Sequence, residues 1–282
     1  MFKNIRCFLS TVLIFAVLIF ANTGEVKAAD SPANEPQGIS VRCGLGSLEG
    51  WNINRLVGCD SLKLFEFPEG SSNYVGRFLI NPSDRKRGGG RRAEVRDPHV
   101  AVNSDETWYR FKTLIPEAFP IDMEHSVVLS QWQEKRFPET PSRRPPIAHR
   151  LVNGEFRVTL WNDDIHDRKK GRGNGIFLYR EPDYAIEKVH EFIYRIKWGP
   201  DKSGSIRAWK RECDILKCKE TTWIRFIDYH GAVGYRELIG YYFKAGLYTV
   251  HEFSRPMIIY HTAYGRGPTP ESIGLDASWN NR

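Results

Sequence analysis

The sequence lacks the short motifs that mark many metal-dependent and nucleic-acid-binding proteins. Neither a CxxC nor an HxxxH spacing occurs, which argues against a zinc site. Zinc-finger, RNP-like and helix-turn-helix patterns are also missing, so no nucleic-acid partner is expected. The 282 residues show no internal repeat and no domain linker, and we therefore expect a single domain over residues 29–282.

Helical periodicity is equally scarce, and alternating strand-like runs take its place. These runs fall at residues 62–67, 74–80, 92–96, 107–114, 126–133, 147–151, 156–161, 175–179, 192–198, 205–209, 223–227, 241–250 and 257–261. Asn153-Gly154 predicts a tight hairpin turn, because both residues accept the positive φ angles that such a turn needs. Many strands joined by turns predict an all-β fold, either an antiparallel sandwich or a barrel.

The N-terminal segment has the composition of a secretory signal peptide. Lys3 and Arg6 precede an apolar stretch at residues 7–21, and Val26-Lys27-Ala28 offers small residues around a cleavage point. The stretch is shorter than the roughly 20 residues of a membrane-spanning helix, although an uncleaved anchor is the alternative. We therefore expect residues 1–28 to be removed, residues 29–38 to be a disordered leader, and the protein to be secreted or periplasmic with no membrane association.

Positive charge prevails in the remaining chain. Removal of residues 1–28 lowers the formal net charge from +7 to +5. A basic secreted protein favours anionic partners, and without nucleic-acid motifs we expect an acidic polysaccharide. Four cysteines remain, an even number typical of disulfide-bonded exported proteins, and the simplest pairing is Cys43–Cys59 with Cys213–Cys218.

Arg92, Glu94 and Arg96 alternate along one predicted strand and would share one face. Two guanidiniums with a carboxylate between them are costly to bury unless they are paired. Glu94 can fix the rotamers of both arginines, whose free edges could then bind a substrate carboxylate in bidentate fashion. The alternative is an ion-pair ladder on the surface.

The predicted strand at residues 126–133 begins apolar and ends with two amides on the same face, Gln131 and Gln133. A Gln amide donates to a carboxylate oxygen without adding charge, so we expect these two residues at a cleft. Two polar residues at an ordinary strand end are the alternative.

The predicted strand at residues 241–250 places Tyr242, Lys244, Gly246 and Tyr248 on one face. Gly246 removes a side chain, so a ligand could approach the backbone there. Lys244 and Tyr248 lie about 13 Å apart along a strand, so any stabilisation of a Tyr248 phenolate by the lysine would act through space. Tyr248 is a candidate proton-transfer group; an aromatic strand with a solvent-reaching lysine is the alternative.

Two segments, residues 81–92 and 167–175, are rich in glycine and basic residues. They are predicted to be mobile loops, either as solvated surface or as cationic borders of a cleft. Residues 138–146 are rich in proline and predict another loop, and Asp163 and Asp164 are expected in a loop or turn.

In sequence order, the motifs Arg-x-Glu, Gln-x-His/Gln and Tyr-Phe-Lys-x-Gly-x-Tyr resemble those of the jelly-roll polysaccharide lyases, which include alginate lyases, glucuronan lyases and the heparin lyase I group. The linking segments TWYRF at residues 107–111, followed by Pro116, and PPIAHR at residues 145–150 are similar to the glucuronan and heparin lyase I type. The resemblance covers roughly residues 92–261, and YFKAGLY is its most specific piece.

The resemblance implies a β-jelly-roll sandwich of two antiparallel sheets with a concave substrate groove, and cleavage of a uronate polymer by β-elimination. In that reaction, neutralising the sugar carboxylate makes the C5 proton removable. Arg92 and Gln131 match the carboxylate-neutralising positions, and Lys244 matches the lysine beside the catalytic tyrosine. Tyr248 matches that tyrosine, which protonates the O4 leaving group and in some members also abstracts the C5 proton. We expect substrate binding by Glu94, Arg96, Arg150 and Tyr242.

One position departs from the family pattern. Many members have a histidine where this chain has Gln133, and an amide cannot act as a base near neutral pH. Either Tyr248 carries out both proton transfers, or another histidine takes over. His149 is the first choice for that role, ahead of His125 and His99. If neither holds, catalysis is lost, and the chain is a non-catalytic binding protein for acidic polysaccharide.

The substrate is left open among glucuronan, heparin-like chains and alginate, which all carry uronates. A jelly-roll glycoside hydrolase would need two carboxylates at a working distance, and no Glu-x-Asp-x-x-Glu strand is present. No cofactor and no metal ligand is assigned. Calcium supports some relatives of the resembled family, but no EF-hand-like loop places an ion here. The protein is expected to be a monomer.

Overall fold

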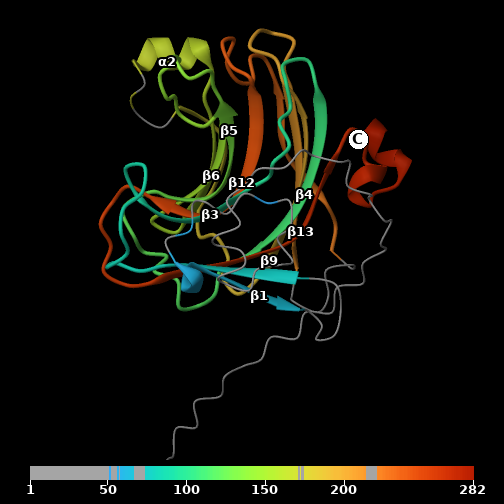
Figure 1. Ribbon diagram of the computed structural model, residues 1–282. Coiled ribbons are helices and arrows are strands. Elements are labelled where there is room, and N and C mark those ends of the chain that lie inside the picture. The colour runs from blue at the N-terminus through green and yellow to red at the C-terminus, as the bar shows by residue number, and fades with distance from the viewer. Residues whose placement is uncertain are drawn as a thin grey trace, which may run out of the picture.

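The strands pair into two antiparallel sheets that face each other across one apolar core (Figure 1). The computed structural model describes residues 51, 56, 58–66, 74–170, 172, 175–213 and 221–282. Seven strands form one sheet in the order β1-β2-β13-β4-β9-β10-β11, and six form the other in the order β3-β12-β5-β6-β7-β8. The predicted all-β jelly-roll sandwich of two antiparallel sheets is confirmed.

Each strand lies at one of the alternating runs of the sequence, although several, β9, β10, β11 and β13 among them, extend beyond their runs. The seven-stranded sheet contains β1 (Leu62–Glu66), β2 (Tyr74–Ile80), β13 (Met257–Gly267), β4 (Glu106–Leu114), β9 (Val189–Lys197), β10 (Ser205–Cys213) and β11 (Ile224–His230). The six-stranded sheet contains β3 (Arg91–Arg96), β12 (Gly240–Thr249), β5 (Val127–Lys135), β6 (Ile147–Val152), β7 (Glu155–Leu160) and β8 (Ile176–Glu181).

The turn between β6 and β7 forms as the sequence predicts. Asn153 and Gly154 both adopt positive φ angles, 48° and 73°. Such angles match the twist of the two flanking strands and fix their register, in which Leu151 lies opposite Phe156.

One expectation about a loop was wrong. Asp163 and Asp164 do not lie in an irregular turn but begin the α-helix α2 (Asp163–Lys169). The Asn162 side chain accepts a hydrogen bond from the Ile165 backbone N–H at 2.9 Å and so caps the helix. Carboxylates in the first turn also interact favourably with the helix dipole. Part of the predicted basic loop at residues 167–175 therefore belongs to this helix.

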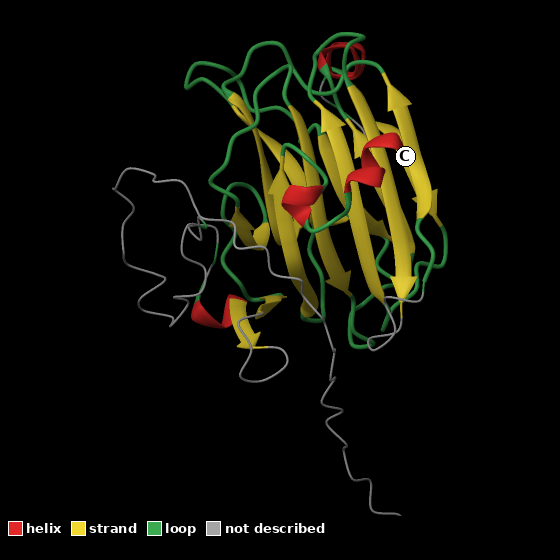
Figure 2. Cartoon of the chain, turned by 90° about the vertical axis from the view of Figure 1, so that its right-hand side faces the viewer, coloured by secondary structure: helices red, strands yellow, loops and turns green. Residues whose placement is uncertain are grey.

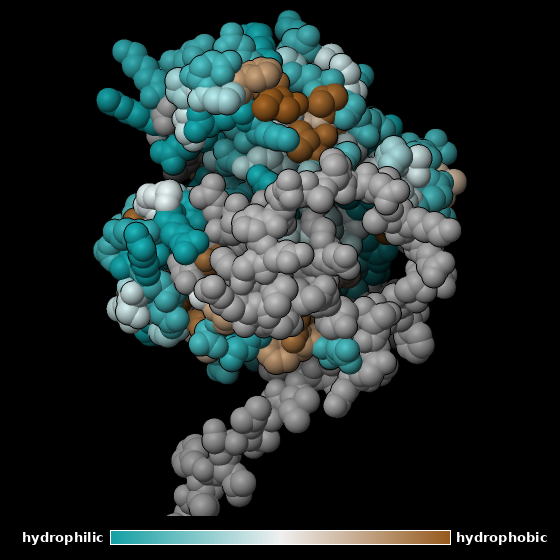
Figure 3. All heavy atoms as spheres, viewed as in Figure 1, coloured by the Kyte–Doolittle hydropathy of each residue, from teal (hydrophilic) through white to brown (hydrophobic). Residues whose placement is uncertain are grey.

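Aromatic side chains from both sheets fill the core. Phe111 and Phe192 come from the seven-stranded sheet and meet Trp132 and Phe243 from the six-stranded sheet, and all four are buried. Such large rings contribute much of the apolar area that stabilises a sandwich. The surface on the side shown in Figure 3 is mostly hydrophilic where it is described, with one group of apolar residues near the top.

Part of the far side of the seven-stranded sheet is covered by the C-terminal segment. Two short 3-10 turns, η4 (Glu271–Ile273) and η5 (Ala277–Asn281), lie over its strands (Figure 2). Trp279 packs edge-on against Trp209, which in turn stacks on Trp108. The C-terminal segment thus covers part of this side of the sandwich with a small aromatic cluster of its own.

Several expectations concern residues outside the described ranges. The signal peptide, the leader at residues 29–38, Cys43 and Cys218 all lie there. Cys59, in the 3-10 turn η2 (Cys59–Ser61), and Cys213 are each disulfide-bonded, and their pairing stays a prediction. Within the described ranges, no helix has the length and apolar character needed to cross a membrane.

Candidate active site

Strand pairing brings the three sequence motifs together on the side of the six-stranded sheet that faces away from the core, called the outer face below. β12 lies between β3 and β5. On β12, Lys244 is opposite Arg96 of β3 and Gln131 of β5, and Tyr248 is opposite Arg92. Residues directly opposite each other in a sheet share a face, so these side chains are neighbours although they are far apart in the sequence.

Glu94 is the centre of this cluster. Its Oε1 accepts a hydrogen bond from Gln131 Nε2 at 2.5 Å, and its Oε2 accepts one from Lys244 Nζ at 2.7 Å. Arg92 Nη1 lies 3.4 Å from the same Oε2. Only 2% of Glu94 is exposed, so this carboxylate is held in a fixed place by donors from three different strands.

The cluster carries more positive than negative charge. Arg92 and Lys244 are both buried beside one carboxylate, and Arg96 lies at the end of the same strand as Arg92. A pair of cations with a single buried counterion leaves a net positive field, which favours an anionic ligand at this face.

Tyr248 lies against Arg92, a contact that the sequence did not predict. The Arg92 guanidinium carbon lies 4.1 Å from the centre of the Tyr248 ring, and Arg92 Nη2 donates to the Gly88 carbonyl oxygen at 2.9 Å. Cation–π contacts of this kind hold the ring in place. The cation lying over the Tyr248 ring is therefore Arg92, while Lys244 binds Glu94.

The glycine-rich segment before β3 has a specific packing role. A Cβ atom at Gly90 would lie 2.3 Å from the Thr249 carbonyl oxygen and 2.6 Å from Tyr248 Cε2. A residue without a side chain thus lets this backbone lie directly against the candidate catalytic tyrosine. The arginine-rich sequence of residues 81–92 alone does not reveal this contact.

Gly246 has a different role from the expected one. It has a φ of +127°, and a Cβ atom there would lie 2.0 Å from the Ala93 carbonyl oxygen and 2.9 Å from Phe78 Cδ1. The space is filled by the neighbouring strand and by the core, so the glycine does not provide ligand access. It is required by an irregularity in β12, where the register with β5 shifts between Ala245 and Tyr248.

Of the four expected substrate-binding residues, Glu94 is the centre of this cluster and the other three lie around it. On one side, the Arg96 guanidinium lies 5.1 Å from the centre of the Tyr242 ring, and Gln133 is opposite Tyr242 in the register. On the other side, Arg150 of β6 is opposite Val128 of β5, which is itself opposite Tyr248. Arg96 and Tyr242 therefore lie toward one end of the strands, and Arg150 lies at the level of Tyr248.

His149 is the expected site residue that the structure removes from the outer face. Only 1% of it is exposed, and its Nε2 lies 2.6 Å from the Tyr194 hydroxyl, inside the core. Burial lowers the pKa of His149 to about 3, with a smaller contribution from His261, so the ring is neutral. The interpretation as a substitute base was wrong, because adjacent strand residues alternate and Arg150 already faces outward.

Two other histidines lie close to the outer face. The rings of His125 and His251 stack with centres 4.4 Å apart and planes within 12° of parallel. Burial, followed by the neighbouring His125, lowers the pKa of His251. His251 was missed in the sequence, although its position just after β12, three residues past Tyr248, is a usable signal. His99 lies beyond β3, where its backbone N–H donates to Asp97.

Among the described residues, no group of three or more histidine, cysteine, aspartate or glutamate side chains is placed to hold a metal ion. The donors gathered around Glu94 are instead N–H groups, which cannot coordinate a cation. The arrangement suits hydrogen bonding to an anion.

Comparison with known proteins identifies similar families and folds. The family model for polysaccharide lyase matches residues 44–264. Endo-β-1,4-glucuronan lyase from the fungus Trichoderma reesei is 16% identical, with a TM-score of 0.52, over 80% of this chain and 98% of that one. No curated protein sequence matches the chain.

Two further solved structures show similarity to the chain. The catalytic domain of a glycoside hydrolase family 131 protein from Coprinopsis cinerea is 9% identical, with a TM-score of 0.52, over 78% of this chain and 84% of that one. A family 7 alginate lyase is 12% identical, with a TM-score of 0.43. The match covers 71% of this chain and 79% of the alginate lyase. Since the glucuronan lyase and the family 131 hydrolase both resemble this fold, the chemistry has to be argued from the site.

Proposed function

Because the chain belongs to the polysaccharide lyase family, we propose that it cleaves a uronate-containing polysaccharide by β-elimination on the outer face of the six-stranded sheet. The observation that carries this proposal is the cluster around Glu94, where Gln131 and Lys244 bind one carboxylate and Arg92 stacks on Tyr248. The predicted signal peptide supports action outside the cytoplasm.

The first task of the site is to neutralise the carboxylate of the sugar. The C5 proton of a uronate is weakly acidic, and its loss places negative charge on the carboxylate as an enolate-like intermediate forms. Arg92 and Gln131 supply N–H donors at a site of net positive charge, and Glu94 keeps both in place before substrate arrives. Donors that are fixed in advance stabilise developing charge without a cost of reorganisation.

The second task is proton transfer, which we assign to Tyr248. The C5 proton passes to a base, the C5–H electron pair forms the C4=C5 double bond, and the C4–O4 bond breaks with its electron pair going to O4. A Tyr248 phenolate accepts the proton and the resulting phenol returns it to O4, so the tyrosine ends as it began. Arg92, whose guanidinium lies against the ring, holds the tyrosine in place for these transfers.

A lyase fits the site better than a hydrolase does. A glycosidase needs a pair of carboxylates on either side of the scissile bond. In the described cluster around Tyr248, Glu94 is the acidic residue, and its oxygens are already bound by Gln131 and Lys244. It is therefore poorly suited to act as a general acid.

The test is a panel of glucuronan, alginate and heparin-like polymers, followed by the ultraviolet absorbance of the new double bond conjugated to the carboxylate. Glucuronan is tested first, because the match to the glucuronan lyase structure covers most of this chain and most of that enzyme. We expect Tyr248→Phe to lower kcat by about 10²–10⁴-fold, the range for loss of a general acid–base group. Binding of a polymer without any absorbance change would favour the non-catalytic alternative instead.

A further inference from the structure

Arg150 is a half-buried cation for which the described residues provide no acidic partner. Its Nε donates to Thr159 Oγ1 and its Nη1 to Ser126 Oγ, both at 3.3 Å, and no ion pair found in the described part of the chain includes it. Burial, followed by repulsion from Arg144, lowers the pKa of Arg150 to about 10. Enclosing a charge without a counterion is unfavourable, so an anion that binds there offsets a cost that the folded protein already carries.

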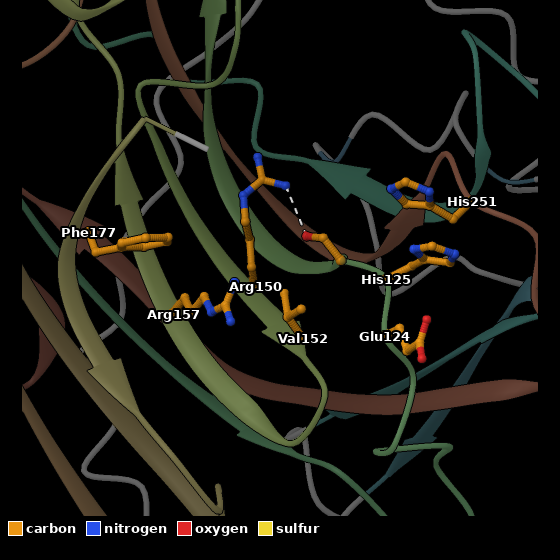
Figure 4. Close-up of a pocket in the computed structure, with 8 residues that line it drawn as sticks. Glu124, His125, Arg150, Val152, Arg157, Phe177 and His251 are labelled. Carbon is orange, nitrogen blue, oxygen red and sulfur yellow. Dashed lines mark hydrogen bonds between the residues drawn. The ribbon is translucent and has the colours of Figure 1, made fainter. Parts of the chain in front are cut away.

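A hollow of about 180 Å³ lies beside this guanidinium (Figure 4). Besides Arg150, its walls include Arg157, Phe177, His125 and His251. We call it the Arg150 hollow. Charged and polar groups on one wall and flat rings on the others are typical of a small-ligand site.

The charges around the Arg150 hollow remain positive in sum. Arg157 is paired with Glu155, but the same carboxylate also binds Arg180. One acid thus serves two arginines, and Arg150 adds a third cation without an acid of its own. Glu124 lies at the edge of the hollow and is exposed to solvent, where its charge is screened.

The hollow lies next to the proposed cleavage point. Tyr248 and Arg150 are both opposite Val128, one on each side of β5. Neighbouring strands are about 4.8 Å apart, so the two residues are separated by about 10 Å across the sheet. A polysaccharide chain that crosses the strands at Tyr248 therefore passes the hollow within a short stretch of sugars.

The other walls offer apolar surface for a sugar ring. Phe177 is 41% exposed, although it is a large hydrophobic residue, and the stacked rings of His125 and His251 lie on another wall (Figure 4). An adjoining hollow of about 290 Å³ is lined by Asp122, Glu124 and Glu252 and by one arginine, Arg255, so it lacks the excess of cations found around Arg150.

We propose that the Arg150 hollow is a binding subsite for a second acidic sugar of the same polymer, whose carboxylate or sulfate is received by Arg150 and whose ring contacts Phe177. This inference rests on the proposed function, since it places the second sugar next to the one cleaved at Tyr248. It makes the enzyme selective for chains in which neighbouring sugars are acidic, over chains in which uronates alternate with neutral sugars.

The test compares Arg150→Gln, Arg150→Lys and Phe177→Ala with Phe65→Ala as a matched control, because Phe65 is also exposed but lies on β1 of the other sheet. We expect Arg150→Gln and Phe177→Ala to raise KM for a polyuronate at least tenfold. Arg150→Lys should recover part of the affinity, and Phe65→Ala should match the wild type. Equal KM values in all variants would overturn the proposal.

Direct binding separates this proposal from the proposed function. In the Tyr248→Phe background, calorimetry with oligouronates should show weaker binding on Arg150→Gln, whether or not the wild type cleaves any polymer. If no polymer is cleaved but Arg150→Gln still weakens oligouronate binding, the subsite proposal is supported and the lyase proposal fails. If inorganic sulfate binds equally to both variants and oligouronate affinity does not change, the subsite proposal fails.

A merely structural role for Arg150 would give a different result. Replacing an uncompensated charge by a neutral amide should leave the melting temperature of Arg150→Gln unchanged or raise it, while affinity falls. A lowered melting temperature together with unchanged KM in Arg150→Lys and Phe177→Ala would assign Arg150 to stability and overturn the subsite.

Discussion

Glu94 is the residue on which the geometry of the site depends, since donors from β3, β5 and β12 all meet at its carboxylate. The sequence pattern Arg-x-Glu-x-Arg alone suggests a pairing between Glu94 and its two neighbours on the same strand. In the folded chain the shorter hydrogen bonds come from Gln131 and Lys244. The carboxylate thus orients groups on three strands and is not simply part of a ladder along one.

Replacing Glu94 by glutamine should therefore damage both stability and activity. Glu94→Gln leaves Arg92 and Lys244 buried without a counterion, and we expect a loss of about 3–5 kcal/mol in the free energy of unfolding. The rate per folded molecule should also fall, because the donors lose their alignment. Urea unfolding and the absorbance assay measure the two effects.

Glu191 provides the matched control. It is fully buried on the seven-stranded sheet, where Arg110 and Arg211 lie within 2.7 Å and 2.6 Å of its carboxylate. Glu191→Gln should cost similar stability but leave the rate per folded molecule unchanged. Equal loss of that rate in both variants would mean that Glu94 acts only through stability.

At the scale of elements, β12 determines how the site is arranged. It carries Lys244 and Tyr248 and lies between the two other strands of the cluster. Its backbone departs from regular pairing at Gly246, and this shift sets which β5 residue lies opposite Tyr248. The position of the tyrosine relative to Arg150 therefore depends on a backbone irregularity.

Gly246→Ala should disturb this element more than other glycine substitutions do. The added Cβ would meet the Ala93 carbonyl oxygen at 2.0 Å and would require an unfavourable φ of +127°. We expect a loss of about 3 kcal/mol in the free energy of unfolding, with reduced activity of the folded protein. Denaturant unfolding and kcat measurements provide the check.

Gly154→Ala is the appropriate comparison, because Gly154 also has a positive φ, +73°, but no atom lies within 4 Å of its added Cβ. Gly154→Ala should lower the free energy of unfolding by only about 1 kcal/mol and leave kcat unchanged. If the two variants behave alike, positive φ alone explains the effect and the close approach of β3 to β12 has no special role.

At the scale of the whole molecule, buried neutral histidines should make stability depend on pH. Burial lowers the pKa of His149 to about 3 and, of His190 and His261, to about 4. The unfolded chain titrates near 6.5 and so binds more protons than the folded chain between about pH 4 and 6.5. Stability should therefore fall as pH falls through this window, by up to about 1.4 kcal/mol per pH unit for each histidine.

Urea unfolding at a series of pH values measures this dependence. His190→Gln should reduce the slope by about one third of the histidine contribution, because one of three buried imidazoles is removed. His230→Gln is the control, since the His230 side chain is 67% exposed and should leave the slope unchanged. Stability that stays constant from pH 7 to 5 would contradict the prediction.

The sequence by itself determined the local features of this protein. Alternation with a period of two located the strands, Asn153-Gly154 located a hairpin, and the motifs around Arg92, Gln131 and Tyr248 indicated the lyase family. Each of these signals depends on neighbours within a few residues, which the chain order supplies directly. The same alternation would have excluded His149 from the face of Arg150, had it been applied there.

Only the tertiary structure decided which strands are neighbours and what each charge meets. β3, β5 and β12 are far apart in the chain, and the choice of β12 as the central strand depends on the packing of the entire sandwich. The stacking of Arg92 on Tyr248, the pairing of Lys244 with Glu94 and the Arg150 hollow all follow from that choice. Long-range pairing and backbone irregularities are set by the whole core, so no short stretch of sequence encodes them.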